Sequence, residues 1–316
     1  MVDYKVELIS RKTKDKLMFG LVENNLSELK ANIHGTCVKF FTDDKEFKEL
    51  WEENFKPMLE DIRPHCRIFS VKKGHAKNKV LYEPTSKTVL IFNCDYYGLV
   101  KSVALGLVAD FFEDFTSEHK RYSIHGSFID FEGRGIALIG PSGTGKTTLT
   151  YGLLLDKENN YLADDWFFVK MNKNEVVAYA SEKNSYVRVD LAKNWKKFKK
   201  AVDGAIKDSK QRGVIDIKRV LGGERIKESS VLKAVVLLQR KKGEQVFQKL
   251  SQKQAIVFLE KNNFCNPHQL IKNKTKLKQR TSFFKQLFKD VPVFLLNTIE
   301  TPQESLLKIK GLLQEF

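Results

Sequence analysis

Apolar positions follow two different spacings in the first third of the chain, and each spacing predicts one kind of element. Short apolar runs bounded by polar residues are typical of strands, and they occur at residues 38–41, 67–71 and 88–92. Residues 42–59 carry apolar side chains on one helical face after an acidic capping segment, so we expect a helix there. A second helix is expected over 97–115, where Lys101 and Asp110 interrupt an otherwise apolar stretch. These elements predict a mixed α/β module over residues 1–118.

The pattern changes after the polar segment 116–121, which we take as the domain boundary. Two alternating runs, 121–125 and 127–131, predict strands that pair with each other, and a turn follows at 132–135. Next come a fully apolar strand, a glycine-rich loop, a helix and another strand, at 136–139, 140–146, 147–155 and 161–163. Strand, loop, helix and strand in this order predict an α/β domain of the P-loop class over residues 119–316.

The glycine-rich loop matches the G-x-x-x-x-G-K-[ST] pattern at every position. Glycines let the backbone N–H groups converge on phosphate oxygens, and the start of the following helix adds a positive field. Lys146 is expected to reach the β- and γ-phosphates, and the Thr147 hydroxyl is expected to bind Mg²⁺. A chance match in a turn is the alternative. The residues expected to contact the nucleotide triphosphate, taken as ATP, are Gly140, Pro141, Ser142, Gly143, Thr144, Gly145, Lys146, Thr147 and Thr148.

Two adjacent carboxylates, Asp164 and Asp165, end the strand that follows this helix. One of them could hold the metal ion, and the other could accept a proton from an attacking hydroxyl group. The alternative is that one aspartate only caps or turns the chain. Because the carboxyl ends of strands near a P-loop are where ligands bind, we favour phosphoryl transfer.

The formal charge of +16 is unevenly distributed along the chain. Residues 1–118 hold 18 basic and 19 acidic side chains, so the excess lies entirely after residue 118. Two basic clusters, 193–210 and 272–289, contribute much of it. Either they form a solvated face or they bind a polyanion such as RNA, and the neutral first module favours the polyanion. Trp195, Phe198 and Val202, and the phenylalanines of the second cluster, are more simply explained as core.

Cysteine spacing and hydropathy argue against several other classes of protein. The four cysteines are widely separated and include no C-x-x-C pair, which argues against structural zinc and against disulfides. The first residues lack the apolar core of a signal peptide, and the longest apolar stretch is too short to cross a bilayer. We therefore expect a cytoplasmic protein with no membrane partner, and an oligomeric assembly is left open.

Three separated blocks resemble the HPr kinase/phosphorylase family: 125–136, the P-loop with 162–165, and 212–223 with the strand at 231–238. The resemblance covers roughly residues 122–240 and implies a kinase domain of that type, with ATP and Mg²⁺. It implies that Asp164 is the proton acceptor, that Asp165 serves the metal together with Thr147, and that His125 lies beside the reacting phosphate. The two aspartates could exchange roles. Asp190 is the candidate for a further metal carboxylate of the family, although its surroundings match poorly.

The chain departs from that family at two places. Residues 191–211 form a basic insertion, and the family's C-terminal Pro-Gly-Arg-Asn run is absent. A kinase core with a basic surface is similar to the archaeal tRNA kinases, which phosphorylate a ribose 2′-hydroxyl, so the preferred acceptor is a tRNA. The alternatives are a protein-serine kinase of HPr-kinase type, a kinase for a small hydroxylated metabolite, and a nucleotide-dependent RNA-binding switch without phosphoryl transfer.

Overall fold

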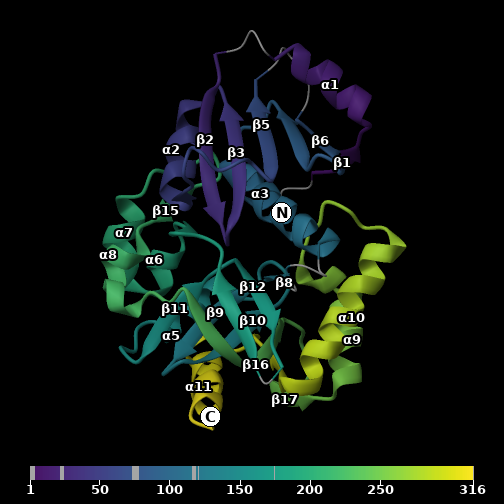
Figure 1. The fold of residues 1–316 in the computed structure, drawn as a ribbon. Helices are drawn as coiled ribbons and strands as arrows, with labels where there is room; N and C mark the ends of the chain where they lie inside the picture. The colour runs from purple at the N-terminus through teal and green to yellow at the C-terminus, as the bar shows by residue number, and fades with distance from the viewer. Residues whose placement is uncertain are drawn as a thin grey trace.

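Two β-sheets, one above the other in Figure 1, form the framework of the molecule. The computed structural model describes residues 4–21, 25–72, 78–115, 119, 121–173 and 175–315. Strands between residues 6 and 92 build the first sheet, and strands between 121 and 297, apart from a separate two-stranded ribbon, build the second. Most of the segment predicted as the domain boundary lies outside the described residues, so the division at 118/119 stays a prediction.

The first sheet is mixed and has the strand order β1-β6-β7-β5-β3-β2-β4. Two helices, α1 and α2, flank it, and α3 follows its last strand (Figure 1). The bounds are β1 Val6–Leu8, α1 Arg11–Phe19, β2 Ser27–Ile33, β3 Thr36–Thr42, α2 Lys45–Asn54, β4 Lys56–Pro57, β5 Cys66–Val71, β6 Lys79–Glu83, β7 Thr88–Phe92 and α3 Tyr97–Asp114. The predicted strands at 38–41, 67–71 and 88–92 are therefore confirmed.

The second sheet runs β11-β9-β10-β16-β13-β12-β8, and β18 extends it beside β16 with β17 at its edge. Its strands are β8 Arg121–His125, β9 Ser127–Phe131, β10 Arg134–Ile139, β11 Asn159–Ala163, β12 Trp166–Met171, β13 Val176–Ala180, β16 Ser229–Gln239, β17 Phe247–Leu250 and β18 Val293–Asn297. Parallel pairing of β10, β16 and β18 forms its centre. This arrangement is the mixed α/β class that the sequence predicts for the P-loop domain.

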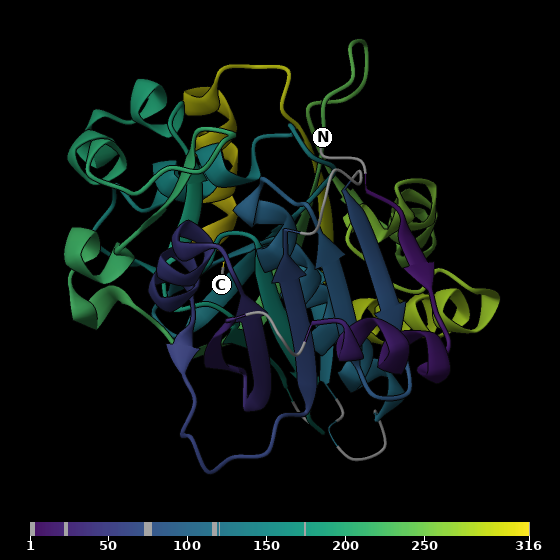
Figure 2. The same ribbon diagram turned by 90° about the horizontal axis from the view of Figure 1, so that it is seen from above.

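Helices and a small ribbon surround the second sheet (Figures 1 and 2). They are α5 Lys146–Leu153, α6 Leu191–Asn194, η1 Lys196–Phe198, α7 Lys199–Asp203, α8 Ile217–Leu221, η2 Gly223–Arg225, α9 Gln252–Lys261, η3 Asn263–Cys265, α10 Lys274–Asp290 and α11 Pro302–Leu313, with the ribbon of β14 Ser185–Arg188 and β15 Arg212–Ile215. Trp195, Phe198 and Val202 are buried, as are Phe283, Phe284 and Phe288, so their assignment to the core is confirmed.

Two local predictions were wrong. The first helix ends at Asn54 rather than near residue 59, because the chain turns to extended backbone at Phe55 and pairs as β4 with β2. The runs 121–125 and 127–131 are strands, but β8 pairs with β12 whereas β9 pairs with β10 and β11. The two runs are consecutive halves of one extended segment, which alternation alone does not distinguish from a hairpin.

Helix α3 lies between the two sheets, and nearly all of its residues are buried (Figure 1). One hydrophobic cluster joins it to strands of the first sheet and to Trp166 and Phe168 of β12. This position explains why its sequence is apolar on every side rather than on one face. Charged side chains on such a helix need partners, because an unpaired buried charge is costly.

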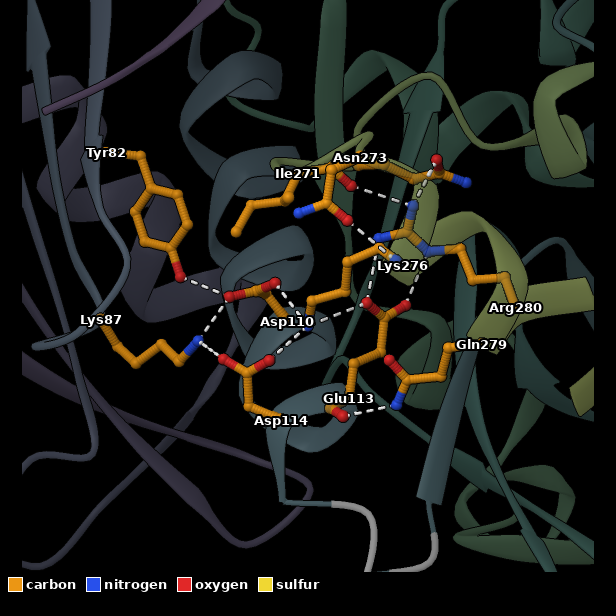
Figure 3. Close-up of polar contacts among 11 residues, drawn as sticks. Tyr82, Lys87, Asp110, Glu113, Asp114, Ile271, Asn273, Lys276, Gln279 and Arg280 are labelled. Carbon is orange, nitrogen blue, oxygen red and sulfur yellow. Dashed lines mark hydrogen bonds and ion pairs between the residues drawn. The ribbon is translucent and has the colours of Figure 1, made fainter. Parts of the chain in front are cut away.

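The C-terminal end of α3 meets its partners in a network of three acidic and three basic side chains (Figure 3). Asp110, Glu113 and Asp114 of α3 pair with Lys276 and Arg280 of α10, and Lys87 joins the group beside β7. Arg280 donates to both oxygens of Glu113, at 2.7 and 3.0 Å. The network fixes α10 against the helix that separates the sheets.

Candidate active site

Two extended segments run side by side at the site. Residues 121–131, β8 running into β9, lie antiparallel to residues 159–171, β11 running into β12. At the junction, the Gly126 backbone N–H donates to the carbonyl of Asp165 at 2.8 Å. A Cβ atom at Gly126 would meet the Leu138 carbonyl oxygen at 2.6 Å, so this close approach requires glycine. This antiparallel pairing brings His125 and the Asp164–Asp165 pair next to the strand β10, which leads into the phosphate loop.

The loop over residues 140–145 follows β10 directly and opens α5, as predicted. Gly143 and Gly145 adopt φ values of +86° and +94°, which favour glycine, and a Cβ at either would meet nothing within 4 Å. The Lys146 ammonium donates to the Gly140 carbonyl at 2.6 Å. Thr298, after β18, donates to the Thr144 carbonyl at 2.9 Å and anchors the loop from outside. The space beside these two glycines lies at the N-terminus of α5, a position at which helices commonly bind phosphate groups.

Asp164 is buried beside the start of α5. Burial, and next the charge of Asp165, raises its pKa to about 7, while Lys101 and, to a smaller extent, the nearby Thr147 hydroxyl act in the opposite direction. Ser185 donates to one of its oxygens at 3.4 Å, and no described residue provides a hydrogen-bond partner for the other oxygen, Oδ1. A buried, unpartnered carboxylate oxygen next to a hydroxyl group is a donor set that suits a hard cation such as Mg²⁺.

Asp165 has a contrasting environment. Its Oδ2 accepts from the Lys101 ammonium at 2.7 Å, and its Oδ1 lies 3.3 Å from Nε2 of His125. Burial would raise the pKa of Asp165, but Lys101 and then His125 outweigh that effect and hold the pKa well below its usual range. The two adjacent carboxylates therefore differ, with Asp165 ionised and Asp164 close to half-protonated near neutral pH.

Glu182 is the third carboxylate of the site, and the sequence did not point to it. Lys101 donates to its two oxygens at 3.1 and 3.3 Å, and the Asn54 side chain donates to Oε1 at 2.7 Å. Both Lys101 on α3 and Asn54 at the end of α2 come from the first 118 residues. The charged position of Lys101 within an apolar helix was visible in the sequence, but its partner was not.

The His125 ring is held from its other side by the carbonyl of Cys265, 2.6 Å from Nδ1. Because a carbonyl only accepts, Nδ1 carries the proton of this bond, and Nε2 faces Asp165. Asn263, Phe264 and Cys265 all have φ between +50° and +54°, an uncommon run for residues other than glycine. This left-handed turn places the carbonyl that orients His125.

The remaining candidates lie elsewhere. Asp190 is half-exposed and pairs with Arg188 at 3.4 Å.

All four cysteines are free and buried, in agreement with the expectation of no disulfides. Within the described ranges, no three His, Cys, Asp or Glu side chains converge as a ready-made metal site, and no helix is long and apolar enough to cross a membrane.

The basic clusters differ in what they present to solvent. Lys193, Lys196, Lys197, Lys199 and Lys200 are exposed on the segment α6–α7. Trp195 of this segment donates to the Thr148 carbonyl at 2.8 Å, so the exposed lysines are anchored to the helix of the phosphate loop. For the second cluster, the prediction of an exposed basic surface was partly wrong, because two of its basic side chains are buried in the protein.

Those two cations are Lys276 and Arg280, which are buried against the acidic residues of α3 (Figure 3). Helical spacing turns these positions toward the protein, whereas Lys272, Lys274, Lys278, Lys285 and Lys289 remain exposed. Counting charges along the sequence therefore overstates the charge that this cluster offers to a polyanion.

Comparison with known proteins connects the chain to one group of kinases. It is 30% identical over 132 residues to the HPr kinase/phosphorylase of Chlorobium phaeobacteroides (strain BS1), which covers 42% of this chain and 33% of that protein. It is 28% identical over 133 residues to the protein of the same name from Prosthecochloris aestuarii, with the same two shares. The chain thus spans about a third of the length of these relatives. No family model matches it.

Among solved structures, the chain is similar to the Hpr(Ser) kinase/phosphatase from Coxiella burnetii. The TM-score is 0.35 and the sequence identity 15%, over 61% of this chain and 99% of the other. The sequence similarity to HPr kinase/phosphorylases agrees with the predicted resemblance. The predicted similarity to archaeal tRNA kinases stays a prediction.

Proposed function

We propose that this protein is a kinase that transfers the γ-phosphate of ATP to a hydroxyl group. The observation that carries the proposal is the meeting of a complete phosphate loop with the Asp164–Asp165 pair, at the junction between the β9–β11 and β8–β12 pairings. Phosphoryl transfer depends on positioning and on charge stabilisation, and the loop amides, Lys146 and the start of α5 can provide both. The sequence similarity to HPr kinase/phosphorylases supports the same reaction class.

In this proposal Asp164 accepts the proton of the attacking hydroxyl, because its pKa of about 7 suits proton transfer near neutral pH. Mg²⁺, held by Thr147 and the ionised Asp165, would neutralise charge on the phosphates. His125 lies beside this pair and keeps Asp165 in place. The unpartnered Oδ1 of Asp164 favours the exchanged assignment, in which Asp164 holds the metal together with Thr147. The variants Asp164→Asn and Asp165→Asn, described in the Discussion, distinguish the two assignments.

The first acceptor class that we propose is a serine hydroxyl on a protein. The relatives are kinases named for the protein HPr, and a serine acceptor is what the resemblance of the sequence blocks to that family implies. The chain lacks the C-terminal Pro-Gly-Arg-Asn run of that family and carries the insertion at 191–211. The identity of the protein partner must therefore be found by experiment. We propose a cytoplasmic location for the same reaction.

RNA, and a tRNA 2′-hydroxyl in particular, is the second candidate, and one observation favours it. The exposed lysines of α6–α7 are anchored to α5 through the bond from Trp195 to Thr148, so a polyanion bound there would lie close to the phosphate loop. Basic surfaces of this kind bind nucleic-acid backbones by releasing counterions. A small metabolite would have no use for these lysines.

A labelling experiment separates the two acceptors. The protein is incubated with γ-labelled ATP and Mg²⁺, in parallel with a protein extract, with total tRNA and with a mixture of small hydroxylated metabolites. Protein-bound label that survives acid supports the serine acceptor, and ribonuclease-sensitive label supports RNA. Label confined to the metabolite fraction would contradict both acceptors while leaving the kinase proposal intact.

A further inference from the structure

The N-terminal module contributes a cation to the acidic site, and its position resembles that of a metal ion rather than that of a surface ion pair. The Lys101 side chain is 1% exposed and contacts two carboxylates, one between β11 and β12 and the other just after β13. Asp165 lies at 2.7 Å and Glu182 at 3.1 Å. A cation that links two carboxylates in this way does what a second metal ion does in many phosphoryl-transfer sites.

The charges of the site require such a cation. Asp164, Asp165 and Glu182 form one cluster, in which the Asp164 and Glu182 side chains are largely buried and the Asp165 side chain is 32% exposed. Carboxylates that raise one another's pKa in this way cannot all remain ionised without compensation. Lys146 is turned toward the carbonyl of Gly140 and is expected to serve the phosphates. Among the described residues, Lys101 is the ammonium that bonds directly to Asp165 and Glu182.

The surroundings of Lys101 hold it in this place. Its helix, α3, is packed between the sheets, and the opposite end of α3 is fixed to α10 by the buried network of Glu113 and Arg280 (Figure 3). Asn54 on α2 orients Glu182 by a bond of 2.7 Å. The cation and the residue that orients its partner therefore both belong to the N-terminal module.

We propose that Lys101 occupies the place of a second divalent cation, so that the site binds one metal ion with its nucleotide instead of two. The proposal rests on the proposed function for the identity of the site, but it concerns the number of cations and not the transfer step. Lys101 is a positioning residue in this account, because it acts through Asp165 and Glu182. Removing its charge should free these two carboxylates and create a second site for a divalent ion.

The test counts Mn²⁺ bound to the full-length protein, by the electron paramagnetic resonance of free Mn²⁺, with and without a non-hydrolysable ATP analogue. We expect one Mn²⁺ per chain with the analogue for wild type and for Lys101→Arg, and two for Lys101→Met. Adding Glu182→Gln to Lys101→Met should return the number to one. The matched control is Lys87→Met, which should still bind one Mn²⁺. It also removes a buried lysine from two carboxylates, but Lys276 remains beside them.

Two results would overturn the proposal: two Mn²⁺ bound to wild type, or no additional Mn²⁺ in folded Lys101→Met. If that variant does not fold, Lys101→Gln, which keeps a polar group in the site, is judged in the same way. Failure of the proposed function has a different signature. A chain that binds no nucleotide analogue would contradict the kinase assignment, while the additional Mn²⁺ of Lys101→Met would still be measured in its absence.

Discussion

Nζ of Lys101 lies 2.7 Å from Oδ2 of Asp165, although 64 positions separate the two residues in the sequence. The lysine belongs to a helix that follows the first sheet, and the aspartate lies between the strands β11 and β12 of the second sheet. Their ion pair makes the N-terminal module part of the candidate site. The variants below test the separate parts of this arrangement.

Replacing Lys146 by alanine should abolish transfer without unfolding the protein. The ammonium would stabilise charge on the transferred phosphate, and loss of one such group typically costs about 3–4 kcal/mol, or on the order of 10²–10³ in rate. Steady-state transfer and thermal melting measure the two effects. Lys157→Ala, just beyond the other end of α5 and exposed, is the control and should behave like wild type. Near-normal transfer by Lys146→Ala would remove the phosphate loop from the mechanism.

The two aspartates should respond differently to removal of their charge. Asp164→Asn is expected to bind Mg-nucleotide but to transfer slowly, by about 10²-fold or more, because the proton acceptor is lost. Asp165→Asn should also raise the Mg²⁺ concentration needed for half-maximal activity. Titration of activity and of nucleotide binding with Mg²⁺ measures both. If only Asp164→Asn weakens metal binding, the roles are exchanged, and unimpaired transfer in both variants would place the proton acceptor elsewhere.

The strand–loop–helix unit and the acidic pair could be predicted from the sequence because each depends on neighbouring residues. Glycine spacing, an apolar strand and a strand-end carboxylate are local signals. The contacts from Lys101 to Asp165 and Glu182 span 64 and 81 positions, and no local pattern encodes them. The predicted pairing of β8 with β9 was wrong for a related reason, because β8 pairs with the distant strand β12 and β9 pairs with the next strand, β10, and with the distant β11. The charged residue in the apolar helix was the signal that could have identified Lys101.

Acid should destabilise the fold in part through His268. Burial, and then the charge of His125, lowers the pKa of His268 to about 3, from 6.5 in the unfolded chain. Between these two values the unfolded state binds a proton that the folded state does not, so stability falls as the pH decreases. One such group contributes at most about 1.4 kcal/mol per pH unit.

Denaturant unfolding at pH 7.5 and pH 5 measures this contribution. His268→Gln loses the contact with Tyr4 at both pH values, so the difference between the two pH values isolates the titration. We expect the variant to lose less stability than wild type on acidification. An equal loss in both proteins would show that His268 is not buried in its neutral form.

The buried network between α3 and α10 should be sensitive to removal of one partner. Arg280→Met leaves Glu113 buried with only Lys276 at 3.3 Å, and unpairing a buried charge typically costs about 3–5 kcal/mol. The double variant Arg280→Met/Glu113→Leu should recover part of the loss. Free energies of unfolding for the four proteins of this cycle give the coupling. A coupling near zero would contradict the paired geometry of Figure 3.

Charge reversal on α6–α7 tests the RNA acceptor. Changing Lys196, Lys197, Lys199 and Lys200 to glutamate should raise the KM for RNA and flatten the dependence of log affinity on log salt, which changes by roughly 0.7–0.9 per phosphate contact. The control carries the same change in charge at four exposed lysines outside both clusters, which are Lys242, Lys249, Lys253 and Lys261. Equal effects in the two proteins, or none in either, would exclude a specific polyanion surface beside α5.

The central claim is phosphoryl transfer at the junction of the phosphate loop and the acidic pair. The most direct measurement compares wild type with Asp164→Asn for transfer of label from γ-labelled ATP to unfractionated cell extract, with nucleotide binding measured on the same preparations. The account predicts label in a phosphoester for wild type and loss of that label in a variant that still binds ATP. Wild-type protein that binds ATP but labels nothing in the extract would contradict the account and favour a nucleotide-dependent switch.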